Sequence, residues 1–113
     1  MQIIKNGITL RELDEMAQKL FGNFVKAVVD TKGKIMAVDA ELHADLEAAL
    51  LEKGSEQKNL WGINLYPGIG GEGFVEFDSM INIRPSQNNR SRDVEDPEVR
   101  KKIIETVNKL VEK

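Results

Sequence analysis

The sequence has no cysteine, and only one histidine, one tryptophan and one tyrosine occur among its 113 residues. Without cysteine, the chain forms no disulfide, offers no thiol nucleophile and holds no metal through thiolates. No serine stands in a nucleophile-elbow pattern, and a serine nucleophile would have only His43 as its base. These absences argue against thiol and serine-triad chemistry. Carboxylates, amides and cations remain as the groups from which a site could be built.

Long hydrophobic runs are also lacking. No apolar stretch is long enough to cross a membrane, and residues 1–5 have no signal-peptide core, so we expect a cytoplasmic protein without a membrane partner. The net charge of -3 provides no general attraction for nucleic acid, which is therefore not expected as a partner. Charged residues make up 31%, a content that points to a thermophile. The length predicts a single domain covering residues 1–113.

Hydrophobic periodicity in the first third of the chain predicts a strand followed by a helix. Residues 2–5 have the pattern of a short strand. Thr9 and Glu12 are three residues apart, the spacing of a capping box that opens a helix. Apolar residues then recur at the helical period up to Gly22, which suits the left-handed position after a helix.

The next segments predict a hairpin and a second helix. Residues 24–29 and 34–39 are apolar runs rich in β-branched residues, and the connector between them contains a glycine. Asp39 is expected to cap a helix over residues 40–53, which Gly54 would end. Alternatively, residues 48–52 extend into a strand and Gly54 lies in a turn. The fold class follows as α+β, in the order β-α-β-β-α-β-β-α. We expect a mostly antiparallel sheet with helices packed on one face.

Two strands and a helix are predicted in the second half. Residues 60–66 and 74–84 should pair antiparallel, and Asp96 followed by Pro97 marks the start of the last helix. Alternation along residues 74–84 places apolar side chains inward and polar ones outward. The core positions expected under the last helix are Trp61, Ile63, Phe77, Ile81 and Ile83.

The candidate site lies where the strand at residues 74–84 ends in a polar, arginine-bearing loop. Sites are often built where loops leave a rigid element. We expect the segment around the only histidine to meet this region and to bind a small anionic ligand. The predicted ligand-binding residues are His43, Asn64, Glu76, Asp78, Asn82, Arg84, Asn89, Arg90 and Arg92.

Residues 41–45 are compatible with two conformations. In a helix, Glu41 and Asp45 share a face and His43 points elsewhere. In an extended segment all three share one face and could hold zinc, manganese or iron. One histidine without cysteine is a poor ligand set, so no metal ligand is assigned and no cofactor is identified.

The arginines of the loop also allow two interpretations. Arg84, Arg90 and Arg92 could form an anion pocket, because guanidinium groups bind carboxylate or phosphate through two hydrogen bonds. The helix that starts near Pro97 would add its N-terminal dipole. Alternatively, the acidic residues of the same region neutralise the arginines internally. These acids are Glu76, Asp78, Asp93, Glu95, Asp96 and Glu98.

These stretches together resemble a family of small bacterial and archaeal proteins, the domain of unknown function 5674. The similar segments are residues 41–45, 54–55, 60–67, 76–85 and 89–92. The resemblance covers essentially the whole chain and is specific to no enzyme class. It implies a self-contained small domain and transfers no activity and no catalytic residue.

Three functional hypotheses follow. The first is a ligand-binding or enzymatic domain, which requires His43, Asn64, Asp78 and Arg84 to converge in one concave pocket. The second is an interaction module that forms a homodimer, which requires a large apolar surface patch. The third is a regulator that contacts RNA through loop arginines, which requires those arginines to face solvent unpaired. We favour the first.

Overall fold

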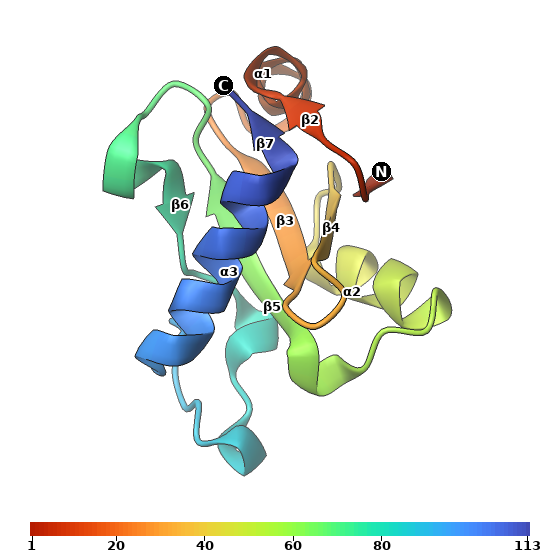
Figure 1. The fold of residues 1–113 in the computed structure, drawn as a ribbon, viewed down its shortest axis with the longest axis vertical. Coiled ribbons are helices and arrows are strands. Elements are labelled where there is room, and N and C mark those ends of the chain that lie inside the picture. The colour runs from red at the N-terminus through yellow and green to blue at the C-terminus, as the bar shows by residue number, and fades with distance from the viewer.

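The computed structural model describes residues 1–113 as one α+β domain built on a five-stranded sheet (Figure 1). The strand order is β1-β4-β3-β5-β6, and each strand is antiparallel to its neighbours. The elements are β1 (Gln2–Ile4), β2 (Ile8–Thr9), α1 (Leu10–Leu20), β3 (Val25–Asp30), β4 (Ile35–Val38), α2 (His43–Glu52), β5 (Leu60–Leu65), β6 (Val75–Glu76), α3 (Pro97–Leu110) and β7 (Val111–Glu112). The predicted class, sheet type and element order are confirmed. None of the helices has the length and apolar character needed to span a membrane.

The helices cover both faces of the sheet. The larger core cluster joins α1 and α3 to one face, and a smaller cluster joins α2 to the other, so α3 and α2 lie on opposite sides in Figure 1. The expectation that all helices share one face is therefore wrong for α2. The reason that helices cover both faces lies in β3, where the consecutive residues Ala27, Val28 and Val29 are all fully buried. A strand that is apolar on both faces needs cover on both.

The helix caps confirm two of the three predicted starts. Thr9 Oγ1 accepts from the Glu12 N–H at 3.1 Å, and Glu12 Oε1 accepts from the Thr9 N–H at 3.3 Å, which completes the capping box of α1. Asp96 caps α3 by accepting from the Glu98 N–H at 2.9 Å. A pairing that the sequence did not indicate joins the ends of the domain, because β2 and β7 are parallel neighbours with Ile8 opposite Val111.

The start of α2 was predicted wrongly. Asp39 does not cap it but adopts a left-handed backbone, φ 73°, with its carboxylate 3.8 Å from the N-terminal ammonium. Leu42 has an extended backbone at the N-cap position, and the helix begins only at His43. Its end agrees with expectation, because Gly54 has φ 99° just beyond the last turn. Of the two alternatives for residues 41–45, the helical one holds from His43 onward. Leu42, which precedes it, is extended and makes no side-chain cap bond.

The strand predicted for residues 74–84 is much shorter in the structure. It pairs antiparallel with β5 as expected, but only over Val75 and Glu76. Trp61 and Ile63 lie in the main core as predicted, and Phe77 packs partly against it. The remaining polar and apolar positions do not follow the predicted alternation.

Beyond Phe77 the predicted alternation is lost. Ile83 is 39% exposed and Ile81 packs against the smaller cluster, whereas Asn82 is fully buried. A short 3-10 turn, Met80–Asn82, replaces the strand and causes this change. The predicted core positions of Ile81 and Ile83 under the last helix are therefore wrong.

Two side chains take the place of the missing strand along the edge of β5. Asn82 Oδ1 accepts from the Gly62 N–H at 2.8 Å, and Asn82 Nδ2 donates to the Gly62 carbonyl at 2.9 Å. Arg84 donates to the carbonyls of Gln57 and, at 2.6 Å, of Leu60, while its guanidinium stacks 4.1 Å from the centre of the Trp61 ring. Backbone groups of a buried edge need partners. Here they find them in an amide and a guanidinium.

We predict that Asn82→Leu lowers the free energy of unfolding by at least about 2 kcal/mol, because buried groups of Gly62 lose their partners. Denaturant titration measures the change. Gln87→Leu is the matched control, since Gln87 also donates to a carbonyl, that of Lys58 at 3.1 Å, but in an exposed position. Equal losses in the two variants would show that the Asn82 amide does not hold the edge.

Candidate functional site

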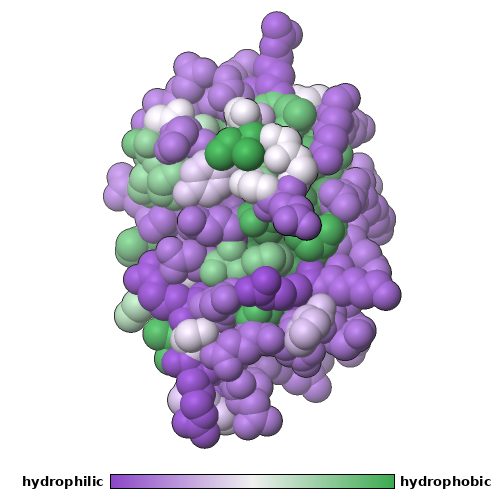
Figure 2. Space-filling model, turned by 90° about the vertical axis from the view of Figure 1, so that its left-hand side faces the viewer, coloured by the Kyte–Doolittle hydropathy of each residue, from purple (hydrophilic) through white to green (hydrophobic).

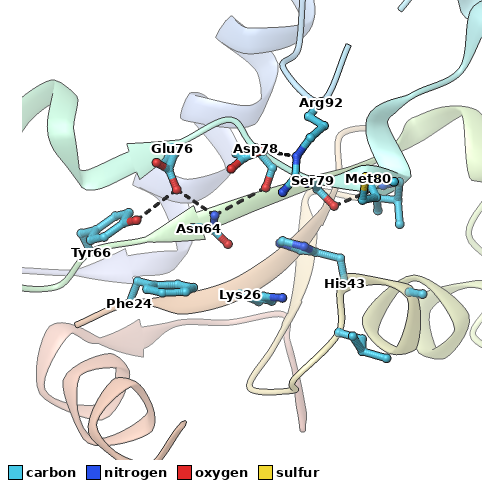
Figure 3. A pocket seen from close by; sticks show the side chains of 13 residues that line it. Phe24, Lys26, His43, Asn64, Tyr66, Glu76, Asp78, Ser79, Met80 and Arg92 are labelled. Carbon is cyan, nitrogen blue, oxygen red and sulfur yellow. Dashed lines mark hydrogen bonds and ion pairs between the residues drawn. The ribbon is translucent and has the colours of Figure 1, made fainter. Parts of the chain in front are cut away.

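A hollow of about 500 Å³ opens on the α2 side of the sheet, beside the first turn of that helix (Figure 3). Lys26 of β3 and Asn64 of β5 lie at its floor, because both point to the face that α2 covers only in part. His43 forms one wall, and the segment that follows β6 forms the other. The residues that complete the lining are Phe24, Leu42, Ala44, Tyr66, Glu76, Asp78, Ser79, Met80, Ile81 and Arg92.

Gly62 allows the two walls to meet the sheet. A Cβ at this position would lie 2.5 Å from both Ser79 Cβ and Ser79 Oγ, and 3.2 Å from His43 Cδ2. Only a residue without a side chain therefore fits beneath His43 and Ser79. The glycine in the pattern of β5 marks a close approach rather than a weak point of the strand.

His43 is held in one tautomer. Its Nε2 lies 2.8 Å from the Ile63 carbonyl, which can only accept, so Nε2 carries the proton. Nδ1 then bears a lone pair and makes no hydrogen bond with the chain. Burial lowers the pKa of His43 below its ordinary value of 6.5, and the nearby charges of Lys26 and Arg92 act in the same direction. The ring is therefore neutral at neutral pH.

A hydrogen-bond network fixes the amide of Asn64. Asn64 Nδ2 donates to Glu76 Oε1 at 2.8 Å, and Tyr66 Oη donates to the same oxygen at 3.0 Å. Burial and this bond raise the pKa of Tyr66, so its hydroxyl stays a donor. Since Nδ2 faces the carboxylate, Oδ1 lies on the other side of the amide (Figure 3).

Two cations and two carboxylates line the hollow, but only one cation forms an ion pair. Arg92 Nε donates to Asp78 Oδ1 at 2.6 Å, which neutralises both groups. Lys26 forms no ion pair, and its ammonium lies 5.1 Å from the centre of the Phe21 ring. The hollow thus contains one cation without a carboxylate partner.

Two of the most exposed apolar side chains stand at the rim. Met80 is 65% exposed and Leu42 is 56% exposed, and both line the hollow. Phe24 and Tyr66 stand together among the lining residues, with ring centres 5.5 Å apart. The hollow therefore combines a polar floor with apolar surface at its mouth.

The structure brings together five of the nine predicted site residues. His43, Asn64, Glu76, Asp78 and Arg92 all line the hollow. The other four, Asn82, Arg84, Asn89 and Arg90, do not line it. Asn82 and Arg84 instead pair the edge of β5, so the expected convergence of Arg84 with His43 is wrong.

Asn89 braces the loop instead of facing the hollow. Its Nδ2 donates to three carbonyls, those of Asn82, Ser91 and Asp93, at 2.8, 3.1 and 2.7 Å. Its Oδ1 accepts from the Glu95 N–H at 2.8 Å. With all its polar atoms engaged inside the chain, Asn89 is a structural residue.

The acids near α3 hold the rest of the loop. Glu95 Oε2 accepts from the N–H groups of Arg90 and Ser91 at 2.9 Å each, and from Ser91 Oγ at 2.8 Å, which keeps the pKa of Glu95 below its usual range. A second hollow of about 510 Å³ borders this region, and Asp96 caps the helix there. The anion pocket expected beside Pro97 is therefore occupied by the protein's own acids.

Sequence reasoning missed Lys26 and Tyr66. Both could have been found, because Lys26 is the only charged residue in the apolar run 24–29 and Tyr66 shares a strand face with Asn64. The backbone at the start of α2 was also missed, since its start had been placed at Asp39. No cluster of three or more histidine or acidic side chains could hold a metal, so the condition for a site at residues 41–45 is not met.

The structure also bears on the two other hypotheses. Arg84 is buried and Arg92 is paired with Asp78, so two of the three loop arginines lack the free, solvent-facing guanidinium that RNA contact was expected to need. On the face shown in Figure 2, hydrophobic surface forms separate patches among hydrophilic atoms. The large exposed hydrophobic residues are Met1, Leu20, Leu42, Leu51, Ile69, Met80 and Ile83.

Fold and hollow together define a small α+β domain with a polar cavity between a helix N-terminus and the face of an antiparallel sheet. The chain belongs to the family described as protein of unknown function (DUF5674), whose model matches residues 2–110. This confirms the resemblance seen in the sequence. No curated protein and no solved structure matches the chain.

Gly62→Ala should destabilise the domain by about 1–3 kcal/mol, because the added methyl group overlaps Ser79 and forces the wall away from the sheet. Thermal or denaturant unfolding measures this. Gly68→Ala is the matched control, because nothing lies within 4 Å of a Cβ there. A Gly62→Ala domain as stable as Gly68→Ala would mean that Ser79 does not pack on the sheet.

The lowered pKa of His43 predicts a pH dependence of stability. Below the ordinary value of 6.5 the unfolded chain takes up a proton that the folded one still excludes, so stability is full above this pH and falls below it. We expect wild type to lose stability relative to His43→Gln between about pH 7 and about pH 5. NMR titration of the single imidazole should give a midpoint below 6.5. A midpoint above this value would contradict the assignment.

Proposed function

We propose that this domain binds a small molecule carrying an anionic group in the hollow beside α2. The single observation that supports this most strongly is that Lys26, which forms no ion pair, lines the same hollow as an uncapped helix N-terminus. The alternatives, a homodimerising module and an RNA-contacting regulator, lack a comparable feature. Binding to this hollow also accounts for the polar floor, which a purely structural surface would not need.

The N-terminus of α2 has free hydrogen-bond donors. No side chain caps the helix, and the backbone N–H groups of His43 and Ala44 have no acceptor within the chain. Leu42, His43 and Ala44 all line the hollow. Free N–H groups and the helix dipole together favour an anion at this end of a helix.

The contrast with α3 supports the choice of this helix. The N-terminus of α3 borders the second hollow, but Asp96 caps it. Each helix has one acid in its first turn, Glu98 in α3 and Asp45 in α2, so the two termini differ at the cap position. At α2 the cap residue is the apolar Leu42, so an external group could take the place that a capping side chain usually fills.

The size of the hollow suits a metabolite-sized ligand. Its volume of about 500 Å³ lies within the usual range of small-molecule pockets. Arg92 also lines the hollow and is 54% exposed, but its charge is paired with Asp78, so Lys26 is the cation left for a ligand. Apolar side chains at the rim would lose water when a ligand covers them.

The arrangement favours binding over nucleophilic catalysis. Ser79 is 1% exposed, and its Oγ accepts from the Ile81 N–H at 3.3 Å. His43 uses Nε2 for the Ile63 carbonyl and forms no bond with Ser79. The two side chains are neighbours above Gly62, but they do not form a nucleophile and base pair.

NMR titration of the ¹⁵N-labelled domain with isocaproate and with inorganic phosphate tests the proposal. We expect at least one of them to shift the amide resonances of His43 and Ala44. Lys26→Gln should weaken binding about tenfold or more, because a charge-assisted hydrogen bond is lost. Lys58→Gln, at the second hollow, is the matched control and should bind like wild type.

The proposal would be wrong if the shifts cluster at the start of α3, or if Lys26→Gln binds as tightly as Lys58→Gln. Shifts that vanish in Lys58→Gln and persist in Lys26→Gln would place the anion site in the second hollow. Circular dichroism of both variants verifies that neither substitution alters the fold.

A further inference from the structure

The floor of the hollow contains a buried acceptor without a partner. Asn64 is 6% exposed, and its Oδ1 makes no hydrogen bond. The two acceptors fix the orientation of the amide, because Nδ2 faces Glu76 Oε1 and the Asp78 carbonyl, at 2.8 and 3.4 Å. Leaving such an oxygen unsatisfied is unfavourable, because its lost hydration is not replaced by a hydrogen bond. A ligand atom that donates a hydrogen bond would recover part of this cost.

Further acceptors surround Asn64. The lone pair of His43 Nδ1, the second oxygen of Glu76 and the second oxygen of Asp78 have no partner within the chain. Each accepts but cannot donate in the ionisation states of neutral pH. An anion alone would leave this side of the hollow unsatisfied.

Donors and acceptors line facing walls of one cavity. The start of α2 provides free N–H donors on one wall, Glu76 and Asp78 provide acceptors on the other, and Lys26 and Asn64 lie side by side on the floor between them. We infer that the ligand is a small zwitterion of the amino-acid type, with a carboxylate toward α2 and an ammonium toward Asn64. This inference rests on the proposed function, because it assigns the anionic group to the same helix N-terminus.

The rim indicates what the rest of the ligand is. Met80 and Leu42 expose apolar surface on the lining, and Phe24 adds an aromatic ring. Burial of such surface stabilises a complex in proportion to the apolar area removed from water. An amino acid with an aliphatic side chain would match the rim, and a strongly charged side chain would not.

Three probes that differ by one group each separate the contributions. Leucine has both charged groups, isocaproate lacks only the ammonium, and isoamylamine lacks only the carboxylate. We expect leucine to bind about tenfold or more tightly than isocaproate, because its ammonium gains charged hydrogen bonds. Isoamylamine should bind most weakly of the three. Chemical-shift titration of the Asn64 side-chain amide and the His43 backbone amide gives the affinities.

Variants of the acceptor side then test the assignment. Asn64→Leu should remove the preference for leucine over isocaproate while isocaproate affinity stays within about twofold of wild type. If Asn64→Leu does not fold, Glu76→Gln serves instead, because Glu76 is exposed and its charge faces the expected ammonium. Glu76→Gln should reduce the preference several-fold.

The outcomes distinguish the two proposals. If isocaproate binds as tightly as leucine, or if neither variant reduces the preference, the zwitterion inference is overturned while anion binding stands. If neither isocaproate nor leucine binds, or if isoamylamine binds as tightly as leucine, the carboxylate site at α2 is overturned and the inference falls with it.

Discussion

The pairing of Gly62 with the side chain of Asn82 is the interaction on which the site depends. The amide supplies one donor and one acceptor to the edge of β5, as a neighbouring strand would. Because the edge is satisfied in this way, the chain after β6 is free to leave the sheet and turn above it. Ser79 then reaches the position above Gly62, and Asp78 and Arg92 reach the wall of the hollow. A continuous strand would have placed these residues along the sheet edge, and no cavity would have formed beside α2.

The two α-helices that begin next to hollows, α2 and α3, show how the cap residue determines what a helix N-terminus can bind. At α3, Asp96 and the neighbouring acids engage the free backbone donors and the loop, so the positive end of the helix is used for folding. At α2, the cap position holds Leu42 and the donors remain unused. The difference is small in sequence, one side chain at one position. With a capping side chain, the N–H groups of the helix terminus are satisfied within the protein. Without one, they are available to a group from another molecule.

The sequence predicted the elements whose signals are local. The capping box at Thr9, the hairpin turn and the Asp96 cap each require only a few adjacent residues. It failed at residues 78–84, because alternation assigns polar side chains to solvent and cannot distinguish an exposed amide from one that replaces a strand. Five of the thirteen lining residues were foreseen, three of them, Glu76, Asp78 and Arg92, in β6 and the segment after it. Lys26 was overlooked, because a lysine in an apolar strand was counted as part of the hairpin, and Arg84 was misplaced, because its partners are distant carbonyls.

Asn82 and Asn64, the two asparagines on this edge, differ in how fully their amide groups are hydrogen-bonded. Asn82 has each of its polar atoms bonded and is fully buried, as expected for a group retained for stability. Asn64 lies two residues from Gly62 on the same strand and is nearly as buried, yet its oxygen has no partner. An aliphatic residue at position 64 would avoid this cost, because it has no polar atom to satisfy. A strand that keeps the amide accepts lower stability at one position, and such local costs are typical of sites where a ligand completes the hydrogen bonding.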